Sequence, residues 1–202
     1  MSADASTSTT ASTALLEGLA RGLDDAWRRI CERYEPVLLR VARRHGLREE
    51  EARDVVQETM TAFLQAFRAH QYDRQRGRLR SWVQGIATNR IRESWRRVPR
   101  REVQIADGGS VTPFLNRIPD DRELADVFEQ EWERGILAEC LRRVRAEVEP
   151  KTLEAFELYV RQEWPAERVA GHLGITRETV YVHKSRVLAR MRELKEELTE
   201  TW

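Results

Sequence analysis

The chain has 202 residues, of which 41% are hydrophobic and 34% are Asp, Glu, Lys or Arg. This length allows one large domain or two small ones, and the composition is charge-rich without being typical of a disordered protein. No apolar run approaches the roughly 20 residues of a membrane-spanning helix, and no secretory signal is visible, so we expect a soluble, cytoplasmic protein.

The formal net charge of +1 conceals an uneven distribution of charge along the chain. Residues 20–101 carry a net charge of +9, whereas residues 102–149 carry −6. Of the 35 basic residues 32 are arginine, the side chain best suited to bidentate contacts with phosphates and base edges. We therefore expect nucleic-acid binding by the basic part, and we hypothesise that the acidic segment shields basic surface in the free protein through Asp120, Asp121 and Glu123.

The N-terminal part of the sequence predicts a tail followed by three long helical stretches. Residues 1–14 are mostly Ser, Thr and Ala, which is typical of a disordered tail, and a passive tail is favoured over a phosphorylation target. Over residues 15–46 apolar side chains recur at helical spacing without interruption. Further helices are expected at about 48–67 and 81–97, with a loop at 72–80 between them.

The remainder of the sequence predicts a connector and a second group of helices. Residues 99–122 contain three prolines and two adjacent glycines and lack periodicity, so we expect a flexible linker. Helices are then expected at about 121–148, 152–162, 165–173 and 177–198. No convincing strand pattern appears, so the predicted fold class is all-α, with two helical domains at residues 15–98 and 123–202.

Residues 164–194 predict two helices joined by a tight turn. Gly174 suits the turn, Ile175 fills the space between the helices, and Thr176 is placed to cap the second helix. In that helix one arc of apolar residues faces inward, which turns an opposite arc outward: Glu178, Tyr181, Val182, Ser185, Arg186 and Ala189. This layout is that of a helix-turn-helix, whose second helix lies in the major groove of DNA.

An ordinary helical hairpin is the alternative for this segment. The Gly-hydrophobe-Thr turn and the arginine on the outer arc favour DNA binding, with Arg186 as the expected base or phosphate contact. His183 flanks the outer arc, and a surface position and a DNA contact are equally compatible with it.

Residues 74–101 combine basic and aromatic side chains. They hold ten arginines and one acid, with Trp82 and Trp95 interleaved. Melted DNA requires cations for its phosphates and rings for its unstacked bases. Composition alone leaves an equal alternative, in which both tryptophans belong to a core and the arginines form a solvated face.

Two segments favour the nucleic-acid interpretation. The sequences DVVQETMTAFLQAF, residues 54–67, and YDRQRGRLRSWVQGIATNRIRESWRR, residues 72–97, closely resemble conserved region 2 of bacterial RNA polymerase sigma factors of the extracytoplasmic-function class in the sigma-70 family. The C-terminal helix pair resembles region 4 of the same class. The resemblance implies a sigma factor that binds core RNA polymerase through its β′ and β subunits, directs promoter-specific initiation, and is held by a regulatory partner such as an anti-sigma factor.

The resemblance also assigns roles to individual residues. The face that docks on the polymerase β′ coiled coil comprises Asp54, Gln57, Glu58 and Thr61. A loop that captures a flipped base and the helix after it recognise the minus-10 promoter element through Tyr72, Arg76, Arg78, Arg80, Trp82, Asn89, Arg92 and Arg96. The minus-35 element is read by a set that largely coincides with the outer arc derived above: Arg177, Thr179, Tyr181, Val182, Ser185 and Arg186.

Some positions depart from the family pattern. Residues 181–183, Tyr-Val-His, replace the usual basic-Ser-Arg triplet, so we expect an altered minus-35 preference. Met60 stands where an aromatic residue is common, and Glu93 stands where Asp is common. None of these changes affects the expected fold.

An enzymatic function has little support in the sequence. The four histidines are dispersed, Cys31 and Cys140 fit no zinc or redox spacing, and no nucleophile or phosphate-binding motif occurs. We expect no catalytic site, metal site or cofactor. The main alternative to a sigma factor is a helix-turn-helix regulator that binds DNA but not polymerase, and it does not explain the segment at 54–67.

Overall fold

The computed structural model describes residues 13–97 and 120–201, with side chains up to Thr199. Within these residues all regular secondary structure is helical, which confirms the all-α fold class. They form two compact units: an N-terminal unit, residues 13–97 and 120–135, and a C-terminal unit, residues 136–201. Helix α5, Asp121–Glu147, contributes its first half to the N-terminal unit and its second half to the C-terminal unit.

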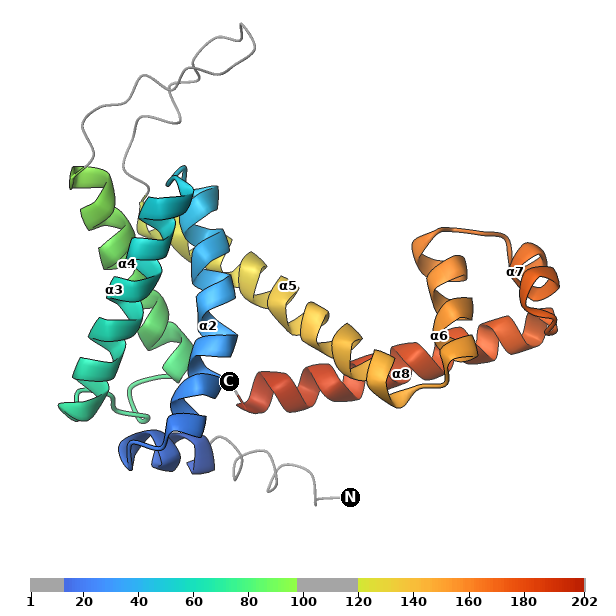
Figure 1. The fold of residues 1–202 in the computed structure, drawn as a ribbon, viewed down its shortest axis with the longest axis horizontal. Coiled ribbons are helices and arrows are strands. Elements are labelled where there is room, and N and C mark those ends of the chain that lie inside the picture. Colours follow the sequence, from blue (N-terminus) through green and yellow to red (C-terminus); the bar gives the residue numbers. More distant parts are fainter. Residues whose placement is uncertain (1–12, 98–119, 202) are drawn as a thin grey trace, which may run out of the picture. The chain divides into compact units, whose positions relative to one another are not determined.

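Three long helices lie side by side in the N-terminal unit: α2, Asp24–Arg44, α3, Glu49–Arg68, and α4, Leu79–Arg97 (Figure 1). The helices expected from the apolar spacing are therefore present, and α4 begins two residues earlier than expected. The core between them consists of large side chains that are at most 2% exposed: Ile30, Tyr34, Val37, Leu38, Val41, Val55, Phe63, Val83 and Ile91. At the start of α3 the carboxylate of Glu51 accepts a hydrogen bond of 3.0 Å from the backbone N–H of Arg48, which closes the first turn.

The expectation of an uninterrupted helix over residues 15–46 is wrong. Residues 13–20 form a helix of their own, which ends in a turn at Gly22 before α2 begins. Gly22 adopts a left-handed backbone with a φ of 70°, and the N–H groups of Gly22 and Leu23 donate to the carbonyls of Leu19 and Gly18. The helix at 13–20 also includes Thr13 and Ala14, which the sequence assigns to the tail; residues 1–12 lie outside the described residues.

The first half of α5 packs in the N-terminal unit, although the sequence assigns residues 123–202 to the second domain. Leu124, Phe128 and Trp132, spaced one helical turn apart, are each at most 2% exposed. Trp132 lies against Tyr34 of α2 with ring centroids 5.2 Å apart. The division between units therefore falls within α5. The expected linker lies outside the described residues except for residues 120–122.

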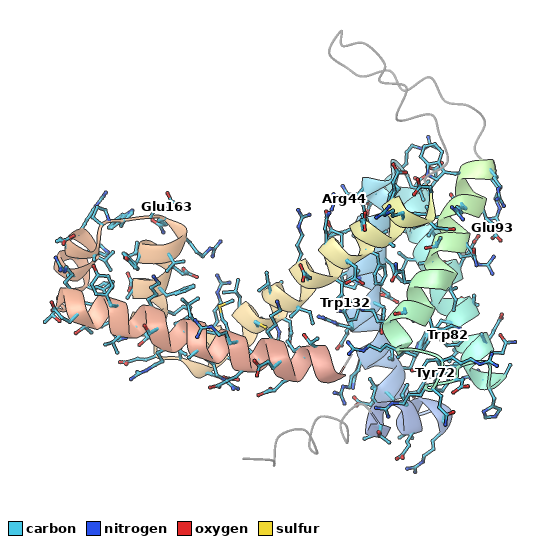
Figure 2. All side chains as sticks on the ribbon, turned by 180° about the vertical axis from the view of Figure 1, so that it is seen from behind. Arg44, Tyr72, Trp82, Glu93, Trp132 and Glu163 are labelled. Carbon is cyan, nitrogen blue, oxygen red and sulfur yellow. The ribbon has the colours of Figure 1, made fainter. Side chains whose placement is uncertain are left out.

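The C-terminal unit contains four further elements: α6, Pro150–Phe156, a π-helical turn η2, Glu157–Arg161, α7, Ala166–Leu173, and the long α8, Arg177–Thr201 (Figure 1). The single helix expected near 152–162 is thus an α-helix that continues as a π-helical turn. Glu163, in a left-handed conformation with a φ of 57°, ends it (Figure 2). The core of this part is formed by Ala155, Leu158, Ala166, Val169 and Val180.

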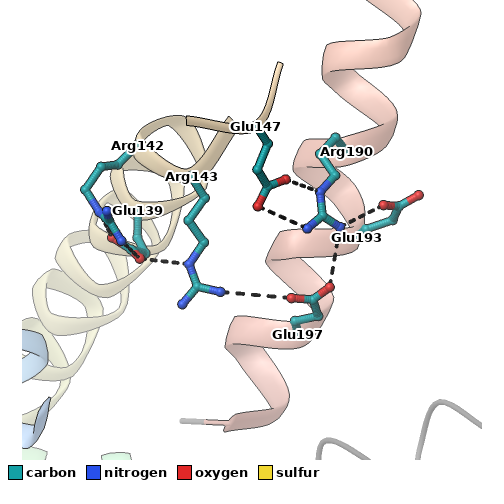
Figure 3. Close-up of polar contacts among 7 residues, drawn as sticks. All are labelled: Glu139, Arg142, Arg143, Glu147, Arg190, Glu193 and Glu197. Carbon is teal, nitrogen blue, oxygen red and sulfur yellow. Dashed lines mark hydrogen bonds and ion pairs between the residues drawn. The ribbon is translucent and has the colours of Figure 1, made fainter. Parts of the chain in front are cut away.

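The second half of α5 is joined to α8 by a cluster of ion pairs (Figure 3). Arg190 of α8 lies 2.6 Å from Glu147 and also pairs with Glu193 and Glu197 on its own helix. Glu139 accepts hydrogen bonds of 2.6 Å from Arg142 and 2.9 Å from Arg143. The bond from Arg142 in particular, with help from Arg143 and against the effect of partial burial, lowers the pKa of Glu139 to about 2.

Among the helices that the structure describes, none combines the length and the apolar character that crossing a membrane requires.

Candidate nucleic-acid interface

The predicted polymerase-docking residues share one side of α3. Asp54, Gln57 and Thr61 are exposed at helical spacing, and Glu58 beside them is half-buried. Glu58 accepts a hydrogen bond of 2.9 Å from Arg97 at the end of α4. The structure therefore leaves three of the four side chains available to a partner and engages the fourth within the unit.

A groove between α2 and α3 borders this face, and sequence reasoning did not identify it. It has a volume of about 740 Å³, and Gln57 and Thr61 form part of its wall. Its lining is mostly apolar and includes Trp27, Pro36, Leu39, Val56, Met60 and Leu64. The periodicity that places Val56 on a different side from the core residues of α3 was the available signal, because a second apolar stripe on one helix requires a second surface.

The loop before α4 is held in shape by contacts of its own. The hydroxyl of Tyr72 donates a hydrogen bond of 3.2 Å to the carbonyl of Gly77, and Asp73 accepts one of 2.8 Å from the N–H of Gln75. The Tyr72 ring stacks on Phe67 of α3 with centroids 6.1 Å apart. This aromatic contact attaches the predicted base-capturing loop to α3.

The two tryptophans of α4 make intramolecular contacts. Trp82 meets Phe63 edge to face at 5.6 Å and lies 5.2 Å from Tyr72 between ring centroids (Figure 2). Trp95 donates a hydrogen bond of 3.0 Å from its indole N–H to the carbonyl of His45. Both side chains remain partly exposed. Trp95 is thus a packing residue, while Trp82 combines packing against the core with a surface beside the loop.

The predicted minus-10 residues fall into two groups. Arg76, Arg78, Asn89 and Arg96 are exposed, and among the described residues Arg76 forms an ion pair with Asp73 in the loop. Arg80 and Arg92 are instead paired with the first half of α5. Arg80 lies 3.0 Å from Glu129 and Arg92 lies 2.6 Å from Asp121, and their side chains are only 21% and 25% exposed.

A buried glutamate on α5 pairs with arginines of α2, and sequence reasoning missed it. Glu131 is 1% exposed and lies 2.8 Å from Arg40, 3.1 Å from Arg44 and 2.6 Å from Arg134. Burial disfavours its charge, but the hydrogen bonds from Arg40 and Arg44 and the charge of Arg134 outweigh this and lower its pKa. The only indication of its burial in the sequence was its position directly before Trp132, which belongs to a predicted buried stripe.

The predicted turn of the C-terminal unit is confirmed. Gly174 adopts the left-handed conformation, with a φ of 60°, and Ile175 packs against the core. The Thr176 hydroxyl accepts a hydrogen bond of 3.2 Å from the N–H of Thr179, which caps α8 as expected. Arg177 lies on the surface and pairs with Glu167 of α7 at 2.8 Å.

The outer arc of α8 is exposed as expected. Tyr181 and Val182 are 41% and 54% exposed, unusually high values for large apolar residues, and Ser185 and Arg186 follow one turn later. Tyr181 meets Tyr159 of η2 edge to face with centroids 5.7 Å apart. An exposed surface of this kind on one helix suits contact with the bases and phosphates of a DNA groove.

The environment of His183 differs from both possibilities that the sequence left open, a surface position and a DNA contact. Its Nδ1 atom and the hydroxyl of Thr152, which is fully buried in α6, form a hydrogen bond of 2.9 Å. The imidazole is partly buried. His183 therefore joins α8 to α6 and is neither a bland surface residue nor directed outward with the arc.

Two features of the described residues bear on metal binding and on nucleophilic chemistry. They contain no cluster of three or more His, Cys, Asp or Glu side chains that could hold a metal ion. Burial and the neighbouring Glu35 raise the pKa of Cys31 to about 12, so its thiol is a poor nucleophile near neutral pH.

Comparison with known families assigns the three-helix part of the N-terminal unit. Residues 30–101 match the family model described as Sigma-70 region 2. The match spans about a third of the chain and covers most of α2 together with α3 and α4. No curated protein matches the chain. The match supports membership of the sigma-70 family and a role in transcription initiation.

Proposed function

We propose that this protein is a sigma factor of the extracytoplasmic-function class. In this role it binds core RNA polymerase through the exposed face of α3, recognises and melts the minus-10 element with the loop at 72–78 and α4, and reads the minus-35 element with the outer arc of α8. It acts in the cytoplasm, without a cofactor and without catalysing a reaction. A regulatory protein such as an anti-sigma factor is its expected partner.

One observation carries the proposal: a sigma-70 region 2 match and a helix pair with an exposed, arginine-bearing outer arc occur in one chain in this order. The α3 face supports the assignment, because Asp54, Gln57 and Thr61 present polar side chains to solvent beside an apolar groove. A polar surface that adjoins an apolar recess is typical of protein interfaces.

A DNA-binding regulator that does not contact polymerase is the second candidate. The exposed arc of α8 favours it equally, because any helix-turn-helix protein needs such a surface. This candidate does not explain the exposed face of α3 or the family match at residues 30–101. Binding to core polymerase therefore separates the two candidates.

The test compares two variants in two assays. Asp54→Ala combined with Gln57→Ala removes two exposed side chains that form no ion pair with another described residue, so the fold should be retained. We expect this variant to lose core-polymerase binding in a pull-down, which is the first assay. In the second assay, DNA binding by the C-terminal unit, it should be unaffected. Arg186→Ala should do the reverse. Equal effects of both variants in both assays would contradict the division of roles.

A further inference from the structure

The first half of α5, residues 121–135, is hereafter the acidic half-helix. It carries six acids and two arginines, whereas α4 carries five arginines and one glutamate. Both belong to the N-terminal unit, and two ion pairs link them directly: Asp121 with Arg92 and Glu129 with Arg80. Segments of opposite charge are therefore in contact inside one compact unit.

The two arginines in this contact are among those assigned to the minus-10 element. A guanidinium nitrogen lies 2.6 Å from a carboxylate oxygen in the pair of Arg92 and 3.0 Å in the pair of Arg80. A carboxylate and a phosphate present the same chemistry to arginine, namely anionic oxygens that accept charge-assisted hydrogen bonds. An arginine that is engaged by one of them is not available in the same geometry to the other.

Packing as well as charge holds the acidic half-helix in place. Trp132 lies against the Tyr34 ring, with the guanidinium of Arg33 4.5 Å and that of Arg80 5.5 Å from its ring centroid (Figure 2). Glu131 is buried among arginines of α2 and its own helix. Arg80 is thus held from two sides, by the Glu129 carboxylate and by the Trp132 ring.

We propose that the acidic half-helix is an intramolecular competitor of DNA: in the free chain it occupies Arg80 and Arg92, and single-stranded DNA binds these arginines only when the half-helix leaves them. The inference rests on the proposed function for the role of the two arginines. Its consequence is a free protein with weak affinity for DNA. The apparent affinity is proportional to the fraction of molecules in which the half-helix has left the two arginines.

Asp120 and Glu123, which the sequence suggested as shielding residues, also stabilise the start of α5. The N–H of Glu123 donates to Asp120 at 2.9 Å, and the N–H of Asp120 donates to Glu123 at 3.2 Å, which together cap α5. Asp121, the third of these acids, pairs with Arg92 of α4 at 2.6 Å. The variant that tests competition therefore combines Asp121 with Glu129.

The experiment measures the affinity of the full chain for a fluorescent single-stranded DNA of mixed sequence, about 20 nucleotides long, by anisotropy at low salt. Mixed sequence suffices because arginine–phosphate contacts are independent of sequence. The test variant is Asp121→Asn with Glu129→Gln. The control variant is Asp126→Asn with Glu133→Gln, which removes the same charge from two exposed positions of the same half-helix that pair with no described residue.

We expect the test variant to bind the DNA about threefold to tenfold more tightly than the wild type, and the control variant to match the wild type within about twofold. Adding Arg80→Ala and Arg92→Ala to the test variant should abolish the gain. Equal affinities for all proteins, or an equal gain in test and control variants, would overturn the inference, the latter because it would reflect net charge alone.

Core-polymerase binding, measured on the same proteins, separates this inference from the proposed function. If the chain binds core polymerase but the test variant gains no affinity for DNA, the competition is wrong and the proposed function stands. If the test variant gains affinity but no protein binds core polymerase, the competition stands and the sigma-factor function is wrong.

Discussion

The Tyr181 ring on the outer arc of α8 meets the Tyr159 ring of the π-helical turn η2 edge to face, with centroids 5.7 Å apart and planes inclined by 76°. Lys184, one turn after Tyr181, places its ammonium group 5.4 Å from the centroid of the same Tyr159 ring. Tyr159 therefore contacts two residues of the predicted DNA-reading helix without belonging to it. This makes it a positioning residue for the reading surface.

Replacing Tyr159 by leucine should weaken binding to promoter DNA. The ring pair restricts the orientation of Tyr181, and such pairs contribute about 0.5–1.5 kcal/mol, so we expect a loss of about threefold to tenfold in affinity. Promoter binding by the protein in complex with core polymerase measures it. Tyr159→Phe keeps the ring and is the matched control, which should bind as the wild type does. A comparable loss with phenylalanine would show that the ring contact is not the cause.

Gly174→Ala should destabilise the C-terminal unit by about 1 kcal/mol, because alanine resists the left-handed conformation that residue 174 adopts. A Cβ atom there would meet no atom within 4 Å, so the cost is conformational and not steric. Gly171→Ala is the control with the opposite sign. Residue 171 lies inside α7 and is equally open, so this change should stabilise the helix by about 0.5–1 kcal/mol. Chemical denaturation measures both, and a stabilising effect at position 174 would contradict the assigned turn.

Thr152→Val should cost about 1–2 kcal/mol of unfolding free energy. The change preserves shape but removes the buried hydroxyl that bonds to His183, and a buried polar partner left without its hydrogen bond is destabilising. Thr199→Val, at an exposed position of α8, is the control and should change stability by less than about 0.5 kcal/mol. If both variants unfold at the same denaturant concentration, the hydrogen bond between Thr152 and His183 does not contribute to stability.

The unfolding free energy should fall in acid partly through Glu139. Its pKa in the folded protein is about 2, below the ordinary value of 4.5, so its contribution is present above pH 4.5 and is lost as the pH falls towards 2. Glu139→Gln should therefore lower stability at neutral pH and reduce the slope of stability against pH in this window. Glu133→Gln on the same helix, which pairs with no described residue, should leave the slope unchanged. An unchanged slope in Glu139→Gln would contradict the ion-pair geometry.

Local patterns predicted most of the helices and the C-terminal turn, because their causes lie within a few residues. The Gly174 turn and the Thr176 cap depend on backbone conformation and on one hydroxyl, and both are visible in the sequence. The break at Gly22 was equally local and was missed: the two aspartates that follow it mark the start of α2.

Long-range contacts were not predictable in the same way. The apolar spacing placed Trp132 in a buried stripe, but nothing in it indicated that its partners were Tyr34 and Arg80. The pairing of Arg80 and Arg92 with the acidic half-helix likewise depends on how α5 packs. The charge counts suggested only that the acidic segment shields basic surface, without naming these pairs. The tertiary structure determines which residues distant in sequence come into contact.

Run-off transcription with purified core RNA polymerase tests whether this protein is a sigma factor, using promoters identified by mapping the protein's binding sites in cells. A sigma factor should yield transcripts of defined length that require both the protein and its promoter, and these should disappear with the Asp54→Ala and Gln57→Ala double variant. If the protein binds those sites but yields no promoter-dependent transcript with core polymerase, it is a DNA-binding regulator and not a sigma factor.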